Sequence, residues 1–218
     1  MKNNPYRIAD AAIKLMNRKA LRIAEKYKRR LNIQGFDELS VIDSVDEMYR
    51  DLSADAHKRF FELFYERYME LMREYPKLHP KHHEEDDVYA LSEYYAVMIL
   101  SYPNPTTTYT YESEIFRKRD RAKEAINAVS GKSAKQAEID KAIRIWARMN
   151  GWYAIIISQE VEIQFFKDCG VKKVQRHEMH DERVCAECME ADGEIYPINK
   201  IPPTHPSCRR WFTPVTKE

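Results

Sequence analysis

Three of the four cysteines in this sequence lie near its carboxyl end, in a pattern suited to binding one metal ion. Two residues separate Cys185 from Cys188, and after a short insert two residues separate His205 from Cys208. Two such pairs let four side chains converge on a tetrahedral ion. Three thiolates and one imidazole would fill all four positions of Zn²⁺, and such a closed shell is typical of a structural site. We therefore expect a structural zinc ion here.

Two other interpretations of these residues stay open. The same side chains could form a metal-free knot with the same geometry, or Cys185 and Cys188 could act as a redox-active C-x-x-C pair. A redox pair of the thioredoxin type belongs to a strand–helix context. Turn-forming residues flank this motif instead, at Asp192–Gly193 and Pro202–Pro203. That context favours a metal site over redox chemistry.

The segment around the cysteines resembles the C-terminal signature of the phage Mu F-like minor head proteins, also called phage head morphogenesis proteins. The signature runs Asp-x-Arg-x-Cys-x-x-Cys, then Asp-Gly, then Pro-Pro-x-His-Pro-x-Cys-Arg, and the resemblance covers about residues 135–218. Many members carry a further cysteine where this chain has Arg210. The signature positions are filled here by Asp181, Arg183, Cys185, Cys188, Asp192, Gly193, Pro202, Pro203, His205, Pro206, Cys208 and Arg209.

The resemblance implies a portal- or capsid-associated protein that acts in procapsid assembly or in genome delivery and is not an enzyme. Its partners would be the phage portal protein, the major capsid protein or both. It would be assembled in the host cytoplasm and would reside in the virion. Residues 1–100 would then supply helical surfaces that dock on the portal or on further copies of the chain.

Two alternative functions follow from the same residues. The first is a zinc-ribbon protein that binds nucleic acid through Arg209, Arg210 and a basic N-terminal helix, which could also contact packaged DNA. The second is a metal-dependent nuclease, which needs a free histidine as base beside an open metal position. His205 is assigned to the metal pair, and no free acid or histidine adjoins it in the sequence. We therefore expect no enzymatic activity.

The charge of the chain is unevenly distributed, although the net charge is only +1. Residues 1–31 hold ten basic residues and two acidic ones, whereas residues 37–93 hold sixteen acidic and seven basic ones. Such segments either attract partners of opposite charge or pack on each other. The longest apolar runs are far shorter than the ~20 residues of a membrane span, so no membrane contact is expected. The absence of a signal peptide at the first residues favours the cytoplasm, where thiols stay reduced.

The remaining pattern predicts an α+β fold that is mainly helical in its N-terminal part. A long helix would pack on a small C-terminal β-sheet that carries the zinc-knuckle-like knot. The aromatic stripe around residues 60–75 is interpreted as packing surface, and Gly170 as a helix cap. Three units are expected: a helical region (1–100), a linker (101–110) and a Mu F-like domain (111–218). Helices are predicted at 5–31, 43–75, 88–100, 111–129 and 133–168, and strands at 172–179, 194–197 and 211–215.

Histidines outside the cysteine motif are interpreted as surface residues. His79, His82 and His83 precede a run of four acids, which is typical of an exposed loop and an acidic helix start. His177 and His180 are three residues apart on a predicted strand, where their side chains would point to opposite faces. Neither group is therefore expected to bind a metal ion.

Overall fold

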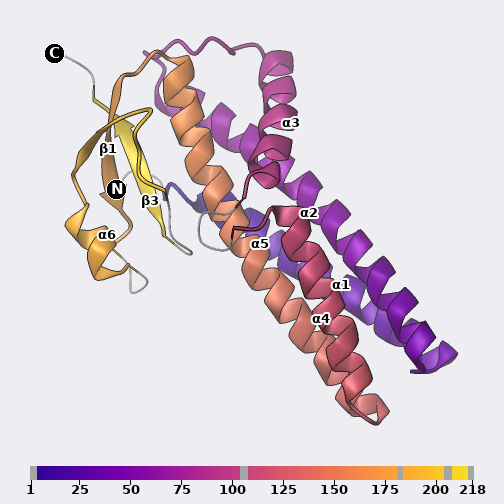
Figure 1. The fold of residues 1–218 in the computed structure, drawn as a ribbon. Coiled ribbons are helices and arrows are strands. Elements are labelled where there is room, and N and C mark those ends of the chain that lie inside the picture. The colour runs from indigo at the N-terminus through magenta and orange to yellow at the C-terminus, as the bar shows by residue number, and fades with distance from the viewer. Residues whose placement is uncertain (1–3, 104–107, 181–183, 204–207, 216–218) are drawn as a thin grey trace.

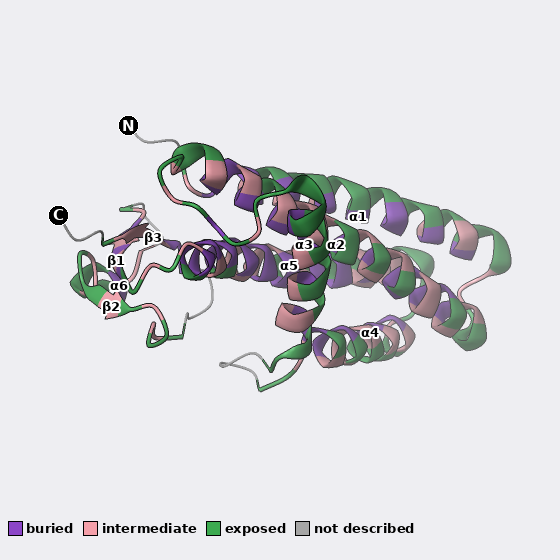
Figure 2. Cartoon of the chain, turned by 90° about the horizontal axis from the view of Figure 1, so that it is seen from above, coloured by how far each residue is buried: buried purple, intermediate pink, exposed green. Residues whose placement is uncertain are grey.

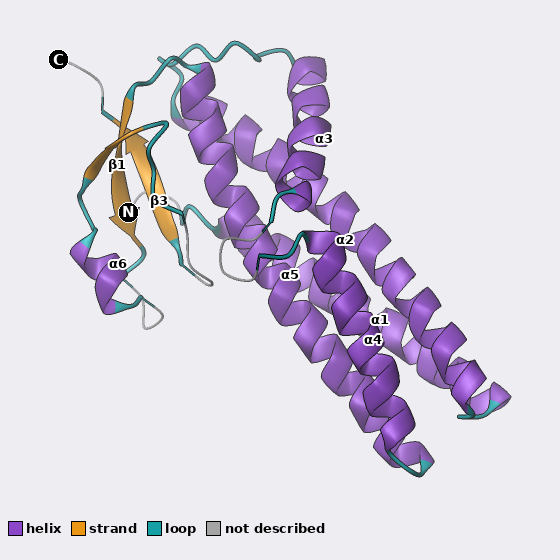
Figure 3. Ribbon diagram, in the orientation of Figure 1, coloured by secondary structure: helices purple, strands orange, loops and turns teal. Residues whose placement is uncertain are grey.

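A computed structural model describes residues 4–103, 108–180, 184–203 and 208–215. Helices dominate these residues, and one small antiparallel sheet lies near the carboxyl end (Figures 1 and 3). The predicted α+β fold is therefore confirmed. The elements are α1 (Arg7–Gln34), α2 (Glu38–Glu74), α3 (Glu85–Ser101), α4 (Tyr111–Ala128), α5 (Lys132–Asp168), β1 (Lys173–Glu178), α6 (Ala186–Glu190), β2 (Ile195–Pro197) and β3 (Arg210–Pro214).

Helices α1, α2, α4 and α5 pack against one another as a bundle, and the sheet lies at one end of it beside α5 (Figure 1). Helix α5 contacts α1, α2, α4 and β3, so it is the element that joins the bundle to the sheet. The buried faces of the helices point toward one another and the exposed faces point outward (Figure 2). Helices from both sides of the predicted linker at 101–110 pack against one another, as α2 does against α5.

The aromatic stripe of α2 lies in the core of this bundle. Phe60, Phe64 and Tyr68 are fully buried, and the ring of Tyr68 packs edge-on against that of Phe165 at 5.3 Å between centroids. Aromatic pairs in this geometry stabilise a core beyond the area that they bury. The interpretation of the stripe as packing surface is confirmed.

The basic first segment packs on the acidic segment that follows it. Helix α1 lies along α2 (Figure 1), and three ion pairs cross their interface. These pairs are Arg7–Glu70 at 2.6 Å, Lys26–Asp51 at 2.9 Å and Arg30–Glu47 at 2.5 Å. Part of the charge asymmetry in the sequence is therefore satisfied within the chain.

Helix α2 begins earlier than the sequence pattern predicts. Asp37 caps it by accepting a hydrogen bond from the backbone N–H of Ser40 at 3.0 Å, so the predicted start at Asp43 or Ser44 is wrong. Asp37 follows the break at Gly35 and provides the side-chain oxygen that an N-cap requires. Ser44 is buried inside the helix instead.

The sheet has the strand order β2-β1-β3, and both pairings are antiparallel. Alternate residues of β1, namely Val174, Arg176 and Glu178, are buried. The sheet is tied to α5, because the backbone N–H of Phe212 donates a hydrogen bond to Glu162 at 3.1 Å. The inward face of β1 thus carries two charged side chains, and this arrangement is unusual unless they have partners.

Two glycines of the α5 region are expected to respond in opposite ways to substitution by alanine. Gly170 caps α5 at φ 71°, a left-handed conformation that strains any L side chain, so Gly170→Ala should destabilise the protein by about 1 kcal/mol. Gly151 lies inside α5, and a Cβ there would contact Ile13 at an ordinary 3.9 Å. Gly151→Ala should therefore stabilise the protein by about 1 kcal/mol. Urea unfolding measures the free energy of unfolding of both variants. Changes of the same sign in the two variants would contradict the prediction.

Candidate metal centre

The structure brings Cys188 and Cys208 together from two separate segments. Cys188 lies on α6 and Cys208 lies two residues before β3, and their sulfur atoms are 3.5 Å apart. Two Zn–S bonds of 2.3 Å at a tetrahedral angle would hold the sulfurs about 3.8 Å apart, whereas a disulfide needs about 2.05 Å. The observed spacing therefore suits two reduced thiols that share one ion.

Cys185 joins this pair through the turn that begins α6. It is the residue directly before the helix, and its backbone carbonyl accepts a hydrogen bond from the Met189 N–H at 3.0 Å. Its side chain forms a hydrogen bond with the Cys188 thiol. The C-x-x-C segment thus forms the start of α6, and a hydrogen bond joins its two thiols. The group of ligand atoms that all lie within 4.8 Å of one another contains Cys188 and Cys208 but not Cys185.

The fourth predicted ligand, His205, lies outside the described residues, as do Asp181 and Arg183 of the signature. Its place in the site therefore stays a prediction. The fourth cysteine of the chain, Cys169, belongs to a different place, at the carboxyl end of α5.

Glu178 is a member of this cluster that the sequence pattern did not indicate. One carboxylate oxygen of Glu178 and the sulfurs of Cys188 and Cys208 all lie within 4.8 Å of one another, and all three residues are buried. The signal that could have indicated it is the two-residue alternation of β1, which places Val174, Arg176 and Glu178 on one face. Because Glu178 falls outside the Cys/His spacing, a search for that spacing misses it.

The environment of the cluster disfavours an isolated thiolate. Burial raises the pKa of the Cys188 thiol well above its ordinary value. Hydrogen bonds with Cys208 and Cys185 and the negative charges of Cys208 and Glu178 raise this pKa further. A cation bound to these thiols would have to displace their protons, so its affinity would increase with pH. The donor set of thiols and a carboxylate fits Zn²⁺.

Three arginines surround the cluster, and all of them are buried. The guanidinium of Arg209 donates to Asp10 at 3.0 Å, and that of Arg210 donates to the backbone carbonyl of Pro202 at 2.7 Å. Arg176 donates to Glu178 at 2.6 Å. Asp10 on α1 is a partner for Arg209 that the sequence did not suggest. Because these side chains are buried, they offer little surface to a nucleic-acid phosphate.

The histidines of β1 and its end have separate partners. His177 stacks on Trp211 at 4.2 Å and shares a hydrogen bond with the Thr213 hydroxyl at 2.8 Å. His180 contacts the carboxylate of Asp192 at 2.8 Å. His180 is exposed, as the sequence predicts, but it lies beyond the end of β1, and His177 is half-buried against Trp211. Within the described ranges, the residues around His79, His82 and His83 do not form a group with converging ligand atoms.

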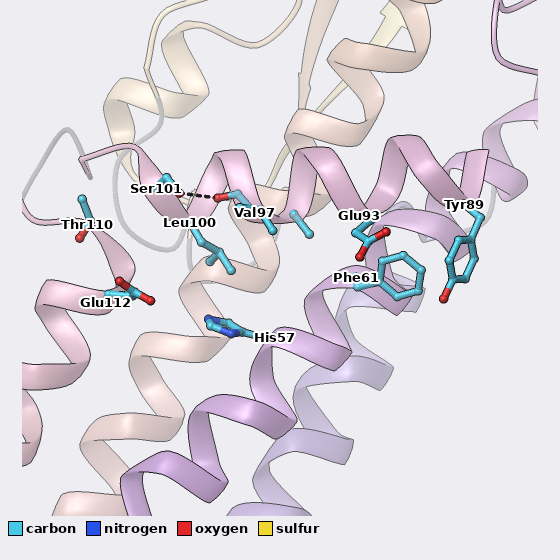
Figure 4. Close-up of a pocket in the computed structure, with 10 residues that line it drawn as sticks. His57, Phe61, Tyr89, Glu93, Val97, Leu100, Ser101, Thr110 and Glu112 are labelled. Atoms are coloured by element: carbon cyan, nitrogen blue, oxygen red, sulfur yellow. Dashed lines mark hydrogen bonds between the residues drawn. The ribbon is translucent and has the colours of Figure 1, made fainter. Parts of the chain in front are cut away.

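A second feature is a groove of about 440 Å³ between α2, α3 and the start of α4 (Figure 4). Phe61, Tyr89 and Val97 contribute apolar surface, while Glu93 and Glu112 contribute carboxylates. Partial burial lowers the pKa of His57 in this groove, although the charge of Glu112 opposes the shift. The groove therefore combines apolar walls with negative charge.

Comparisons with known protein families, with curated proteins and with solved structures find no match to this chain. No helix in the described part of the chain combines the length and the apolarity that crossing a membrane requires.

Proposed function

We propose that this chain is a phage minor head (head morphogenesis) protein that associates with the portal or capsid and has no catalytic role. A structural Zn²⁺ would be held by Cys185, Cys188, Cys208 and a fourth donor, for which the signature indicates His205. The observation that carries the proposal is the burial of the thiols, since Cys188 is 2% exposed and Cys208 is 3% exposed. A catalytic zinc ion needs a position open to substrate. Buried thiols from two separate segments are instead typical of a structural ion that cross-links those segments.

The candidate metal centre is connected to the helical bundle by direct hydrogen bonds. The side-chain amide of Gln159 on α5 donates to the backbone carbonyl of Cys208 at 2.7 Å and to the hydroxyl of Tyr6 at 2.9 Å. The Tyr6 hydroxyl in turn donates to the backbone carbonyl of Arg210. A metal ion at this point would therefore fix the sheet relative to α1 and α5, as a rigid assembly component requires.

Helix α3 is the surface that we propose for portal contact. Only Val88, Ser92, Ala96 and Leu100 of this helix are buried, which leaves most of its circumference at the surface. Exposed apolar patches mark interaction surfaces, and the adjacent groove adds the carboxylates of Glu93 and Glu112 (Figure 4). A basic segment with apolar side chains on the portal protein would complement this surface. Exposed large apolar residues on and just after α3 are Tyr89, Tyr94, Val97 and Tyr102.

Portal binding should be lost when a charge is placed on this surface. Val97 is 64% exposed on α3, and Val97→Asp should lower copurification of the co-expressed portal protein at least tenfold, because it adds a charge to an apolar contact. Ile33 is 87% exposed near the end of α1, so Ile33→Asp is the matched control and should leave copurification unchanged. Portal copurification that is equal for both variants and the native chain would contradict the proposed surface, and absence of copurification with the native chain would contradict the proposed function.

A second candidate function, nucleic-acid binding, has one observation in its favour. Lys14, Arg18 and Arg22 are exposed on α1 and form no ion pair within the described residues. Against it, Arg209 and Arg210 are buried rather than presented at the surface. Retention of DNA that falls steeply with added salt would favour this function over a purely structural one.

A further inference from the structure

We propose that Glu178 occupies the fourth position of the metal centre and binds the ion directly through its carboxylate. This inference rests on the metal centre in the proposed function, and it assigns a ligand from outside the cysteine–histidine signature. With Cys185, Cys188 and Cys208, Glu178 would complete a shell of four ligands, which is the coordination number of structural zinc sites.

The first observation is that one oxygen of this carboxylate lacks a hydrogen-bond donor in the part of the chain that the structure describes. The Glu178 side chain is 0% exposed, and its Oε1 atom accepts a hydrogen bond from Arg176 Nε at 2.6 Å. Its Oε2 atom is buried, and no hydrogen-bond donor among the described residues reaches it. A buried charged oxygen without a hydrogen bond is strongly unfavourable, because it has lost its hydration without replacement. A bound cation would remove that cost.

The second observation is the distance between this carboxylate and the thiols. A Glu178 oxygen lies within 4.8 Å of both the Cys188 and the Cys208 sulfur, so the three atoms already surround one point. Carboxylate oxygens bind Zn²⁺ at about 2.0–2.2 Å and thiolates at about 2.3 Å. A small closing movement of the loops would therefore bring all three atoms to bonding distance of a single ion.

Backbone contacts fix the position of Glu178 before any ion binds. Its N–H donates to the carboxylate of Asp192 at 2.9 Å, and it pairs across the sheet with Arg210, two residues after Cys208. The carboxylate therefore comes from the sheet, whereas the thiols come from α6, from the residue before it and from the segment before β3. A ligand held on a strand is positioned more accurately than one held on a loop.

The charges of the buried groups balance when a divalent cation is present. Three thiolates and the Glu178 carboxylate contribute four negative charges, and the buried guanidinium groups of Arg176 and Arg210 contribute two positive ones. Zn²⁺ supplies the remaining two. The buried guanidinium of Arg209 is compensated separately by the carboxylate of Asp10. Buried charges are tolerated when they are compensated in this way.

The test compares Zn²⁺ affinity in Glu178→Gln, His205→Ala and the native full-length chain, by competition with a chelator. The glutamine amide oxygen can still accept the Arg176 hydrogen bond, so Glu178→Gln preserves the local shape. It should weaken Zn²⁺ binding at least tenfold, and His205→Ala should weaken it less than threefold. Glu190→Gln, an exposed acid on α6, is the matched control and should have no effect. Circular dichroism of each apoprotein verifies that it is folded.

Cobalt substitution provides a second readout. With Co²⁺ in place of Zn²⁺, Glu178→Gln should shift the d–d absorption bands and retain the thiolate charge-transfer bands, because an oxygen ligand changes and the sulfur ligands remain. Unchanged affinity and spectrum in Glu178→Gln would overturn the inference, as would weaker affinity with an unchanged spectrum. A tenfold loss in His205→Ala would also overturn this fourth-ligand assignment and leave the proposed metal centre intact. A native chain that binds neither ion would overturn the centre itself.

Discussion

Removal of the metal ion with a chelator is expected to unfold the C-terminal module, residues 173–215, while the helical bundle stays folded. A sheet of three short strands is only marginally stable without further support. A structural zinc ion contributes on the order of 10 kcal/mol to the folding of such a fragment. Amide hydrogen exchange in β1 and β3 should therefore accelerate at least a hundredfold, while exchange in the middle of α5 should change little.

A pair of cysteine variants provides the control for this prediction. Cys188→Ser should reproduce the effect of the chelator, because it removes a thiol from the cluster. Cys169→Ser should not, because Cys169 lies at the end of α5, where burial and the charge of Asp168 raise its thiol pKa to about 12. Equal exchange in the sheet before and after metal removal would show that packing alone holds the module.

Replacing Arg67 by methionine is expected to destabilise the protein by about 3–5 kcal/mol, the cost of leaving a buried charge without its partner. Arg67 is 3% exposed and pairs with Glu162 at 2.5 Å and Glu70 at 2.6 Å. Glu162 is 2% exposed and also accepts the Phe212 N–H, so the loss should extend to the contact between α5 and the sheet. Urea unfolding of Arg67→Met measures the effect.

Two further variants separate this effect from a general loss of packing. Arg7→Met removes the other partner of Glu70, but the Arg7 side chain is 62% exposed, so the expected cost is at most about 1 kcal/mol. The double variant Arg67→Met/Glu162→Gln should recover most of the stability that Arg67→Met loses. The glutamine side chain introduced by Glu162→Gln would carry no charge, and its amide oxygen could still accept the hydrogen bond from the Phe212 N–H. A double variant as unstable as Arg67→Met alone would contradict the uncompensated-charge explanation.

The helices could be predicted from the sequence because their apolar residues recur with a helical period. The aromatic stripe of α2 and the cap at Gly170 both follow from local patterns, and the structure confirms them. The start of α2 was predicted too late, since Asp37, Asp43 and Ser44 all have side-chain oxygens that could cap a helix and the helix begins at the first of them. Local signals thus determine the type of an element better than its ends.

The buried charges could not be predicted from the sequence. Glu70 falls on a regular series of glutamates that is typical of an exposed helix face, yet the structure buries it against Arg7 and Arg67. Burial by itself would raise the pKa of Glu70, but the hydrogen bonds from these arginines outweigh it and lower the pKa. The partners lie 63 and three residues away, so the first contact depends wholly on the fold.

Only the part of the candidate metal centre that depends on local spacing could be predicted from the sequence. The spacing of Cys185 and Cys188 defines a local turn, and the meeting of Cys188 with Cys208 follows from the paired motif. Glu178 joins them only because β1 and β3 pair in a particular register, with Glu178 opposite Arg210. Register depends on the whole sheet, and no spacing rule within one segment contains it.

Elemental analysis of the purified native chain tests the central claim most directly. The account predicts one zinc ion per chain, together with three cysteines that are protected from alkylation until a chelator is added. A chain that contains no metal ion, and whose cysteines 185, 188 and 208 react at once with the alkylating agent, would contradict it.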